Sequence, residues 1–358
     1  MIKTDTQKIE RMGAFDLARG LAILFMVLIH VLIFYGQPQV QDNLFGILIE
    51  ALGSWPAAPV FVFIMGVFIT YTKHNNLQKG LRRAVYLFML GYLLNLARGS
   101  LPMWLSLEMG LVSYQQLGGY TPLTELLIVD VLQFAGLAYA ICLLSQRMIA
   151  EPRIWVFIAI IIAFMSPWLW DIKTDSWIVN QVLKLFIGHP DNGAMFPLLP
   201  WLSYPFIGMA FGYWLKQSAD KTRLFKQSFF AGTILMISGG LLALSNINYH
   251  FGDIMRSGPG AILMSSGFVL SWLGICHFMV IKIPANPVFN LLYFWSNQVT
   301  KLYIVQWLFI GWGLMMLGSQ QLSFSQTVAA MLVMLLLSDL GTRFWVFKSQ
   351  RKLTVQTQ

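Results

Sequence analysis

Apolar segments long enough to cross a lipid bilayer recur along the whole chain. A membrane-spanning helix needs about 20 predominantly apolar residues, and we count about ten such segments in the 358 residues. Only 11% of the residues are charged, whereas soluble domains have about 25%. We therefore predict an all-α polytopic membrane protein. The expected spans are residues 14–35, 54–73, 80–98, 122–145, 153–170, 197–216, 227–246, 259–281, 296–317 and 325–347.

Lysine and arginine, which give the chain a formal net charge of +9, gather in alternate loops. Loops rich in these residues stay in the cytoplasm, so the pattern predicts an even number of spans with both termini cytoplasmic. The intervening loops hold only Arg98, Lys173, Lys184 and Arg256. The basic balance is therefore a topology signal, and it gives no support to nucleic acid as a partner.

We expect three parts along the chain: a cytoplasmic segment at 1–13, a transmembrane domain at 14–347 and a cytoplasmic tail at 348–358. The first apolar segment is too long for a signal-peptide core, so we expect it to be retained as a span. These features predict a multi-pass protein of the bacterial plasma (inner) membrane. A segment at 177–187 has helical apolar spacing and is expected on the outer surface, where it either covers a site or merely docks at the interface.

Three ionisable residues interrupt the first apolar segment, "FDLARGLAILFMVLIH". Arg19 and His30 are eleven residues apart, which is close to three helical turns, so they share one face roughly 16 Å apart along the axis. Asp16 lies three residues before Arg19 on the same face. Ionisable groups inside a membrane are costly and mark functional sites. The alternative is an Asp16–Arg19 pair at the headgroups and a histidine that only packs between helices.

Several motifs in this order resemble those of the transmembrane acyltransferases, in the branch of heparan-α-glucosaminide N-acetyltransferase. "DLARGLAILFMVLIH" is similar to the first-helix signature of the group, with a histidine eleven residues after an Arg-Gly pair. "FPLLPWLSYPFIGMAFG", at 196–212, resembles its Phe-Pro-Leu-x-Pro-Trp motif. The further similar segments are "PVFVFIMGVF" at 59–68, "RRAVYLFMLGYLLN" at 82–95, "VLQFAGLAYAI" at 131–141 and, more weakly, "TKLYIVQWLFIG" at 300–311.

The resemblance implies an enzyme that transfers an acyl group, usually acetyl, from cytoplasmic acyl-CoA to an acceptor on the other side of the membrane. It implies a bundle of ten or eleven helices, with Arg19 near the CoA end and His30 as the catalytic group. The lysosomal member has its histidine in the following lumenal loop, but this chain has no histidine between His30 and His74. A late-helix pattern that commonly ends in histidine has Gln306 here.

Acetyl-CoA is thus the expected co-substrate, and a sugar or glycan with a free amine or hydroxyl is the expected acceptor. Arginine and lysine bind phosphate well, and the basic residues available near the cytoplasmic boundary are Arg19 with its partner Asp16, Lys79, Arg82, Arg83 and Lys301. Except for Arg19 and Lys301, a plain topology role is the favoured explanation for each of these residues. Membrane lipids are further partners, and a homodimer is left open.

A neutral imidazole can accept a proton from the acceptor, and such a base works best when a second group fixes its tautomer. We expect Asp130, about two turns inside the fourth span, to do this for His30. The alternative is an Asp130 bound to water or to Gln133. Direct transfer is preferred over an acyl-histidine, although one histidine fits both.

Other functions remain open from the sequence. Buried Asp and His residues also make proton relays, so a proton-coupled secondary transporter or a lipid or glycan flippase is the main rival. Cys142 and Cys276 form no metal or redox motif, and the histidines lack metal-ligand spacing, so no metal is expected. His250, Asp253 and Arg256 form an outer polar cluster that is either a site or a solvated loop, and Asp339 and Arg343 are expected to pair within the last helix.

Overall fold

The structure, a computed structural model, describes residues 12–54, 57–72, 76–188, 193–253 and 255–356. Within these ranges every regular element is helical, which confirms the all-α prediction. The described part contains nine helical stretches long and apolar enough to cross a membrane. They are α1 (Gly13–Tyr35), α3 with α4 (Leu44–Ser54, Ala57–Tyr71), α5 with η1 and α6 (Leu77–Asn95, Leu96–Ser100, Leu101–Glu108), α8 (Val131–Met148), α9 with η2 (Pro152–Met165, Ser166–Leu169), α13 (Lys221–Ala243), α15 (Pro259–Lys282), α17 (Val299–Leu317) and α18 (Phe324–Gln356).

Two expected spans have different limits in the structure. The segment expected at 122–145 is broken: α7 (Pro122–Leu126) is a short separate helix, and the span itself, α8, starts at Val131. The segment expected at 197–216 forms α11 (Leu198–Trp201) and α12 (Ser203–Gln217). With 15 residues, α12 rises about 22 Å, which explains why it is not among the nine longer helices.

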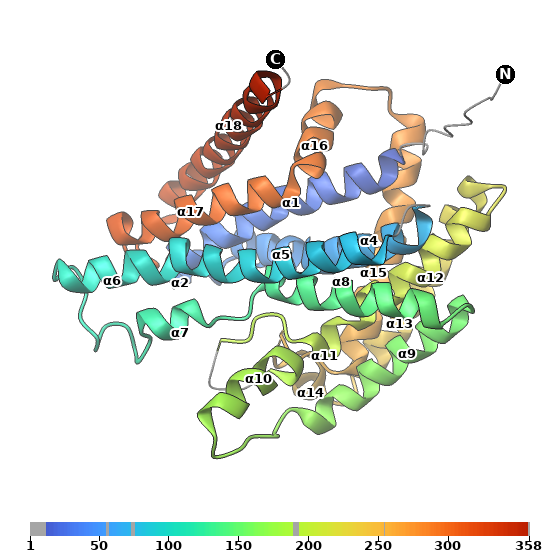
Figure 1. Cartoon of the computed structure of the whole chain (residues 1–358), viewed down its shortest axis with the longest axis horizontal. Helices are drawn as coiled ribbons and strands as arrows, with labels where there is room; N and C mark the ends of the chain where they lie inside the picture. The colour runs from blue at the N-terminus through green and yellow to red at the C-terminus, as the bar shows by residue number, and fades with distance from the viewer. Residues whose placement is uncertain (1–11, 55–56, 73–75, 189–192, 254, 357–358) are drawn as a thin grey trace.

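Helix α1 lies at the centre of the bundle. Its neighbours are α3, α4, α15, α16 (Pro287–Asn297), α17 and α18. Phe15, Leu17, Ala18 and Ile23 on α1 have no exposed surface. Figure 1 shows α1, α4, α5, α8 and α17 running beside one another through the molecule. A helix buried on nearly all sides can hold polar groups away from both lipid and water, which is the condition for a reactive site inside a membrane.

Helices α4 and α12 pack closely because α12 has two glycines, which lack side chains, where the helices meet. Gly208 and Gly212 have the small-xxx-small spacing that lets transmembrane helices approach. A Cβ at either position would overlap a backbone carbonyl of α4, at Phe63 and Val67 respectively. The second half of "FPLLPWLSYPFIGMAFG" therefore serves helix packing.

The remaining short helices are α2 (Pro38–Gln41), α10 (Trp177–Ile187) and α14 (Ile247–Phe251). The surface helix expected at 177–187 is thus confirmed as a helix. The segment expected at 1–13 lies outside the described residues up to residue 11. Helix α18 continues through the expected boundary at 347 as one helix.

Candidate active site

A widened helical turn places an arginine inside the protein. Residues Leu96–Ser100 form a π-helix between α5 and α6, and such turns often occur at functional sites. Arg98, in this turn, is only 6% exposed. Gly311 of α17 lies directly against the Arg98 carbonyl, where any Cβ would overlap the oxygen. The absence of a side chain at Gly311 thus lets α17 reach the π-helical turn.

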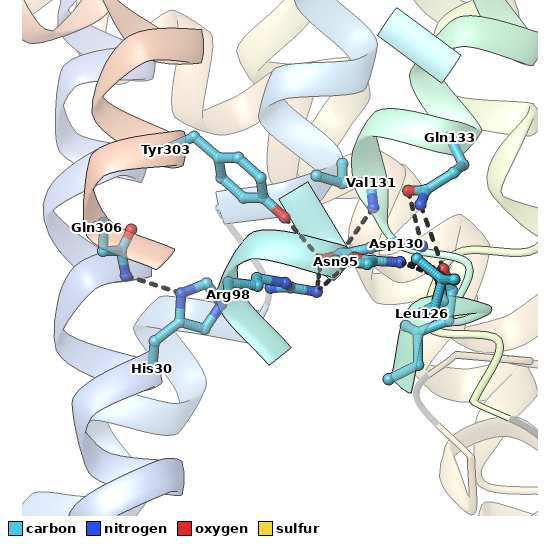
Figure 2. A network of polar contacts seen from close by, with 10 residues as sticks. His30, Asn95, Arg98, Leu126, Asp130, Val131, Gln133, Tyr303 and Gln306 are labelled. Carbon is cyan, nitrogen blue, oxygen red and sulfur yellow. Dashed lines mark hydrogen bonds and ion pairs between the residues drawn. The ribbon is translucent and has the colours of Figure 1, made fainter. Parts of the chain in front are cut away.

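Asp130 is the partner of Arg98. Arg98 Nη2 donates to Asp130 Oδ2 at 2.6 Å, and Tyr303 Oη donates to the same oxygen at 2.8 Å. The other oxygen, Oδ1, accepts from the Val131 amide at 2.7 Å, so Asp130 is the N-cap of α8. Figure 2 shows this carboxylate where side chains from three helical elements meet.

Side-chain amides hold the two members of the ion pair. Asn95 Oδ1 accepts from Arg98 Nη2 at 3.2 Å, and Asn95 Nδ2 donates to the carbonyls of Leu126 and Ile128. Gln133 completes the capping box, because its Oε1 accepts from the Asp130 amide at 3.2 Å. Residues of α5, α8 and α17, together with the segment before α8, therefore fix the position of Arg98.

The Phe-Pro motif supports the same segment through the backbone. The Val129 amide donates to the Gly193 carbonyl, and the Val129 carbonyl accepts from the amides of Met195 and Phe196. Val129 directly precedes Asp130. The outer stretch that begins the Phe-Pro motif thus helps to set the place of the N-cap.

His30 lies at the other end of this network (Figure 2). Its Nδ1 is 2.8 Å from Gln306 Nε2 on α17. The imidazole centroid is 4.4 Å from that of the Trp307 ring, and the Arg98 guanidinium carbon lies 3.8 Å from the centroid of the same indole. Trp307 therefore contacts both the imidazole and the guanidinium.

The structure corrects the expected relation between His30 and Asp130. Gln306, and not Asp130, contacts the imidazole nitrogen. Asp130 also stands at the start of α8 and not two turns inside a helix. The reason is that "TPLTELLIVD" reads as one apolar run, whereas the chain turns between α7 and α8. The alternative in which Asp130 binds Gln133 agrees better with the structure, since the Asp130 amide donates to Gln133 Oε1.

Asp16 and Arg19 pair near the beginning of α1. Arg19 Nη2 donates to Asp16 Oδ1 at 2.9 Å, and the Ser296 hydroxyl donates to the same oxygen at 2.8 Å. The Arg19 side chain is 21% exposed, and its Nε has no hydrogen-bond partner among the described residues. The guanidinium also lies 5.3 Å from the Phe68 ring centroid. This cation thus reaches the surface while one carboxylate orients it.

The other basic candidates lie on helices other than α1. Lys79, Arg82 and Arg83 are exposed at the start of α5, where Arg83 packs on Tyr139 of α8. Lys301 is half-buried in the first turn of α17. The structure therefore brings Asp16 and Arg19 together, whereas the other four cations lie on α5 and α17.

Two further predictions concern residues away from this network. Arg343 Nε donates to Asp339 Oδ2 at 2.7 Å, which confirms the pair within the last helix. In the outer cluster, Arg256 pairs with Asp253 at 2.8 Å, and His250 Nδ1 accepts from the Gly260 amide. His250 lies in α14 and is only 3% exposed, so this part of the cluster is not a solvated loop. Among the described residues, no group of three His, Cys, Asp or Glu side chains could hold a metal ion.

Sequence reasoning missed Arg98, Tyr303 and Trp307. Arg98 carried a signal, since it is an arginine directly after a long apolar run, in a stretch where the charge pattern predicts few basic residues. Glu125 was also missed; burial raises the pKa of its carboxyl, and the nearby Arg98 opposes that shift. The contacts of Tyr303 and Trp307 join residues far apart along the chain, and one sequence does not reveal them.

A match to a protein-family model identifies the family of the chain. The model for the catalytic domain of heparan-alpha-glucosaminide N-acetyltransferase matches residues 11–245. The chain belongs to this family. No curated protein matches it. Membership of the heparan-alpha-glucosaminide N-acetyltransferase family supports an acetyltransferase-type function in a multi-pass membrane protein. It also confirms the family resemblance that the sequence motifs indicated. The matched range includes His30, Arg98 and Asp130, whereas Tyr303, Gln306 and Trp307 lie beyond it.

Proposed function

We propose that this protein transfers an acetyl group from cytoplasmic acetyl-CoA to an amine or hydroxyl of a sugar or glycan acceptor on the other side of the membrane. The observation that carries the proposal is the arrangement on α1. A partly exposed arginine with an orienting carboxylate stands near one end of the helix, and a histidine held by Gln306 stands eleven residues later. This interval suits a co-substrate with a charged phosphate end and a distant thioester.

Arg19 is proposed to bind a phosphate of the donor. An arginine fork matches phosphate oxygens, and Asp16, which also accepts from the Ser296 hydroxyl, holds the guanidinium in place from one side. Lys301, Lys79, Arg82 and Arg83 are proposed to contribute further positive charge along the same membrane boundary. The exposure of Lys79, Arg82 and Arg83 supports a role in attracting the donor more than a role in a fixed contact.

His30 is proposed as the general base. The base must accept a proton on Nε2, so its ring proton must lie on Nδ1 and be donated to an oxygen. With Nε2 of Gln306 toward the ring, the amide donates to Nδ1 instead. A half-turn of the amide presents Oε1, which is buried and has no hydrogen-bond partner among the described residues. We propose that this second arrangement is the reactive one.

The reaction is proposed as direct transfer. The acceptor nitrogen or oxygen attacks the thioester carbonyl carbon while His30 takes its proton, and the carbon–sulfur bond then breaks. The imidazolium returns that proton to the leaving CoA thiolate. Asp130 is proposed to act through Arg98 and not on the imidazole, because both its oxygens are engaged elsewhere.

The test is acetyl transfer by the purified protein in liposomes, with acetyl-CoA outside and glucosamine inside. We expect His30→Ala to lower turnover by about 100-fold or more. His277→Ala is the control, since His277 contacts Thr222 and Phe225 on another helix pair. Equal acetylation by the His30→Ala and unaltered proteins overturns the proposal. Proton-coupled sugar uptake without acetylation favours the transporter instead.

The same liposomes address the remaining expectations of topology and location. We propose that both termini are cytoplasmic and that the protein lies in a bacterial plasma membrane, as the loop charges indicate. Protease access to a tag at each terminus tests the orientation. Protection of one tag and cleavage of the other in sealed vesicles contradicts it.

A further inference from the structure

The guanidinium of Arg98 uses only one of its three nitrogens. Nη2 donates to Asp130 and Asn95. Nε and Nη1 are buried, and neither has a hydrogen-bond partner among the residues that the structure describes. An arginine has five N–H donors, and a buried donor without a partner costs free energy. Such a group in a native protein calls for a partner from outside the chain.

The side chain that carries these donors packs on the same indole ring as the base. The Arg98 guanidinium carbon is 3.8 Å from the Trp307 ring centroid, and the His30 ring centroid is 4.4 Å from it. A carbonyl group that reaches His30 for attack by an acceptor therefore comes close to Arg98.

We propose that Arg98 binds the carbonyl oxygen of the donor thioester and stabilises the negative charge that forms on it. This inference rests on the proposed function. When the acceptor attacks the carbonyl carbon, the carbon–oxygen π electrons move to the oxygen, and His30 takes the acceptor proton. When the tetrahedral intermediate collapses, those electrons restore the carbonyl, and CoA leaves as the thiolate.

The charges in the site support this role. Before reaction, Arg98 and Asp130 balance each other, and a neutral His30 adds no charge. During reaction an oxyanion and an imidazolium appear together, so the total charge stays unchanged. Donors that are already aimed at the developing charge need no rearrangement, which is the main source of such stabilisation.

The position of Arg98 is fixed before any substrate arrives. Asp130, Asn95 and Trp307 contact the guanidinium, and Tyr303 fixes the carboxylate from α17. The π-helical turn holds the Arg98 backbone at the position from which the guanidinium reaches Asp130. The arginine is therefore preorganised, in contrast to a surface arginine that must lose side-chain freedom.

The test is steady-state kinetics of Arg98→Lys and Arg98→Met with acetyl-CoA and glucosamine, together with the rise in melting temperature caused by CoA. We expect kcat to fall about 100-fold in Arg98→Met, with both KM values changed less than about threefold. Arg98→Lys keeps the charge but lacks the fork, so we expect an intermediate loss. The rise in melting temperature with CoA should persist in both variants.

Arg256→Met is the matched control, because Arg256 also pairs with an aspartate and lies 5.9 Å from a tryptophan ring, that of Trp170. We expect its kcat to be unchanged. A loss confined to the KM for glucosamine assigns Arg98 to acceptor binding and overturns the proposal, and so does an unchanged kcat. Loss of the CoA effect in both Arg98 variants assigns a donor-binding or structural role and also overturns it. His30→Ala in the same assay reports separately on the proposed function.

Discussion

Arg98 and Asp130 form a buried ion pair of 2.6 Å that joins a π-helical turn to the N-cap of another helix. The pair links the packing of α8 with the charge beside His30. A buried pair that loses one charge leaves the other uncompensated, which costs about 3–5 kcal/mol. Changes at this pair should therefore alter both stability and turnover.

Asp130→Asn tests the charge while keeping the cap. Asparagine caps helices as well as aspartate does, so α8 should keep its start, whereas Arg98 loses its counter-ion. We expect acetyl transfer to fall by at least about 10-fold, with the CoA-induced rise in melting temperature retained. Asp253→Asn, in a half-exposed pair with Arg256, is the control. Unchanged turnover in Asp130→Asn removes Asp130 from the site.

Tyr303→Phe removes one donor to the Asp130 carboxylate and little else. A hydrogen bond to a charged group contributes about 1.5–3 kcal/mol, so we expect lower thermal stability and a smaller loss of kcat than in Asp130→Asn. Tyr35→Phe is the matched control, because Tyr35 Oη also makes a buried hydrogen bond between two helices. It donates from α1 to the Ile310 carbonyl of α17 at 2.7 Å. Kinetics should separate the two: only Tyr303→Phe should lower kcat.

Gln306→Met keeps the length of the side chain but removes the hydrogen bond to His30. Without a partner on Nδ1 the ring tautomer is no longer fixed, so we expect kcat to fall by about 10-fold or more, with KM for acetyl-CoA unchanged. Gln306→Glu offers only an acceptor when ionised and should retain more activity than methionine. Gln146→Met, which removes an amide that donates to the Ile69 carbonyl, is the control. Equal activity of Gln306→Met and the unaltered protein speaks against the tautomer argument.

Arg19→Ala tests the donor end. We expect CoA to stabilise the unaltered protein by about 2.7 kcal/mol at 100 times its Kd, and this stabilisation should be lost in the variant. Arg343→Ala is the matched control, since Arg343 also pairs with an aspartate on its own helix and lies 4.4 Å from a phenylalanine ring centroid. CoA titrations followed by thermal unfolding measure both. Retained stabilisation in Arg19→Ala places the phosphate site elsewhere.

Gly311→Ala tests the approach of α17 to the π-helical turn. Its Cβ would overlap the Arg98 carbonyl, so the helices must separate. Overpacking typically costs about 1–3 kcal/mol, and the shift should also move Trp307 and Gln306 away from His30 and lower kcat. Gly240→Ala is the control, because its Cβ would meet only the Met264 sulfur at 3.8 Å. Similar melting temperatures for the two variants contradict this packing.

The recurrence of long apolar segments predicted much of the membrane fold. The three-residue spacing on α1 correctly put Asp16 and Arg19 on one face, and the structure joins them. The surface helix α10 and the Asp339–Arg343 pair were also predicted, because each depends on residues within a few turns. Local spacing is sufficient for such features.

The rest of the site depends on contacts that one sequence does not carry. Tyr303 meets Asp130 across 173 residues, and Gln306 meets His30 across 276. The π-helical turn around Arg98 and the break before α8 arise where tertiary contacts override apolar periodicity. Asp130 was therefore chosen as a site residue for a contact with His30 that the structure gives to Gln306.

The backbone pairing of Val129 with Gly193, Met195 and Phe196 has a consequence for acceptor recognition. A glycan that displaces this outer stretch on binding would shift Val129, and with it the adjoining Asp130 and its arginine. Binding of the acceptor and binding of the thioester beside Arg98 would then be thermodynamically linked. By reciprocity, a bound donor would change the affinity for the acceptor by the same factor.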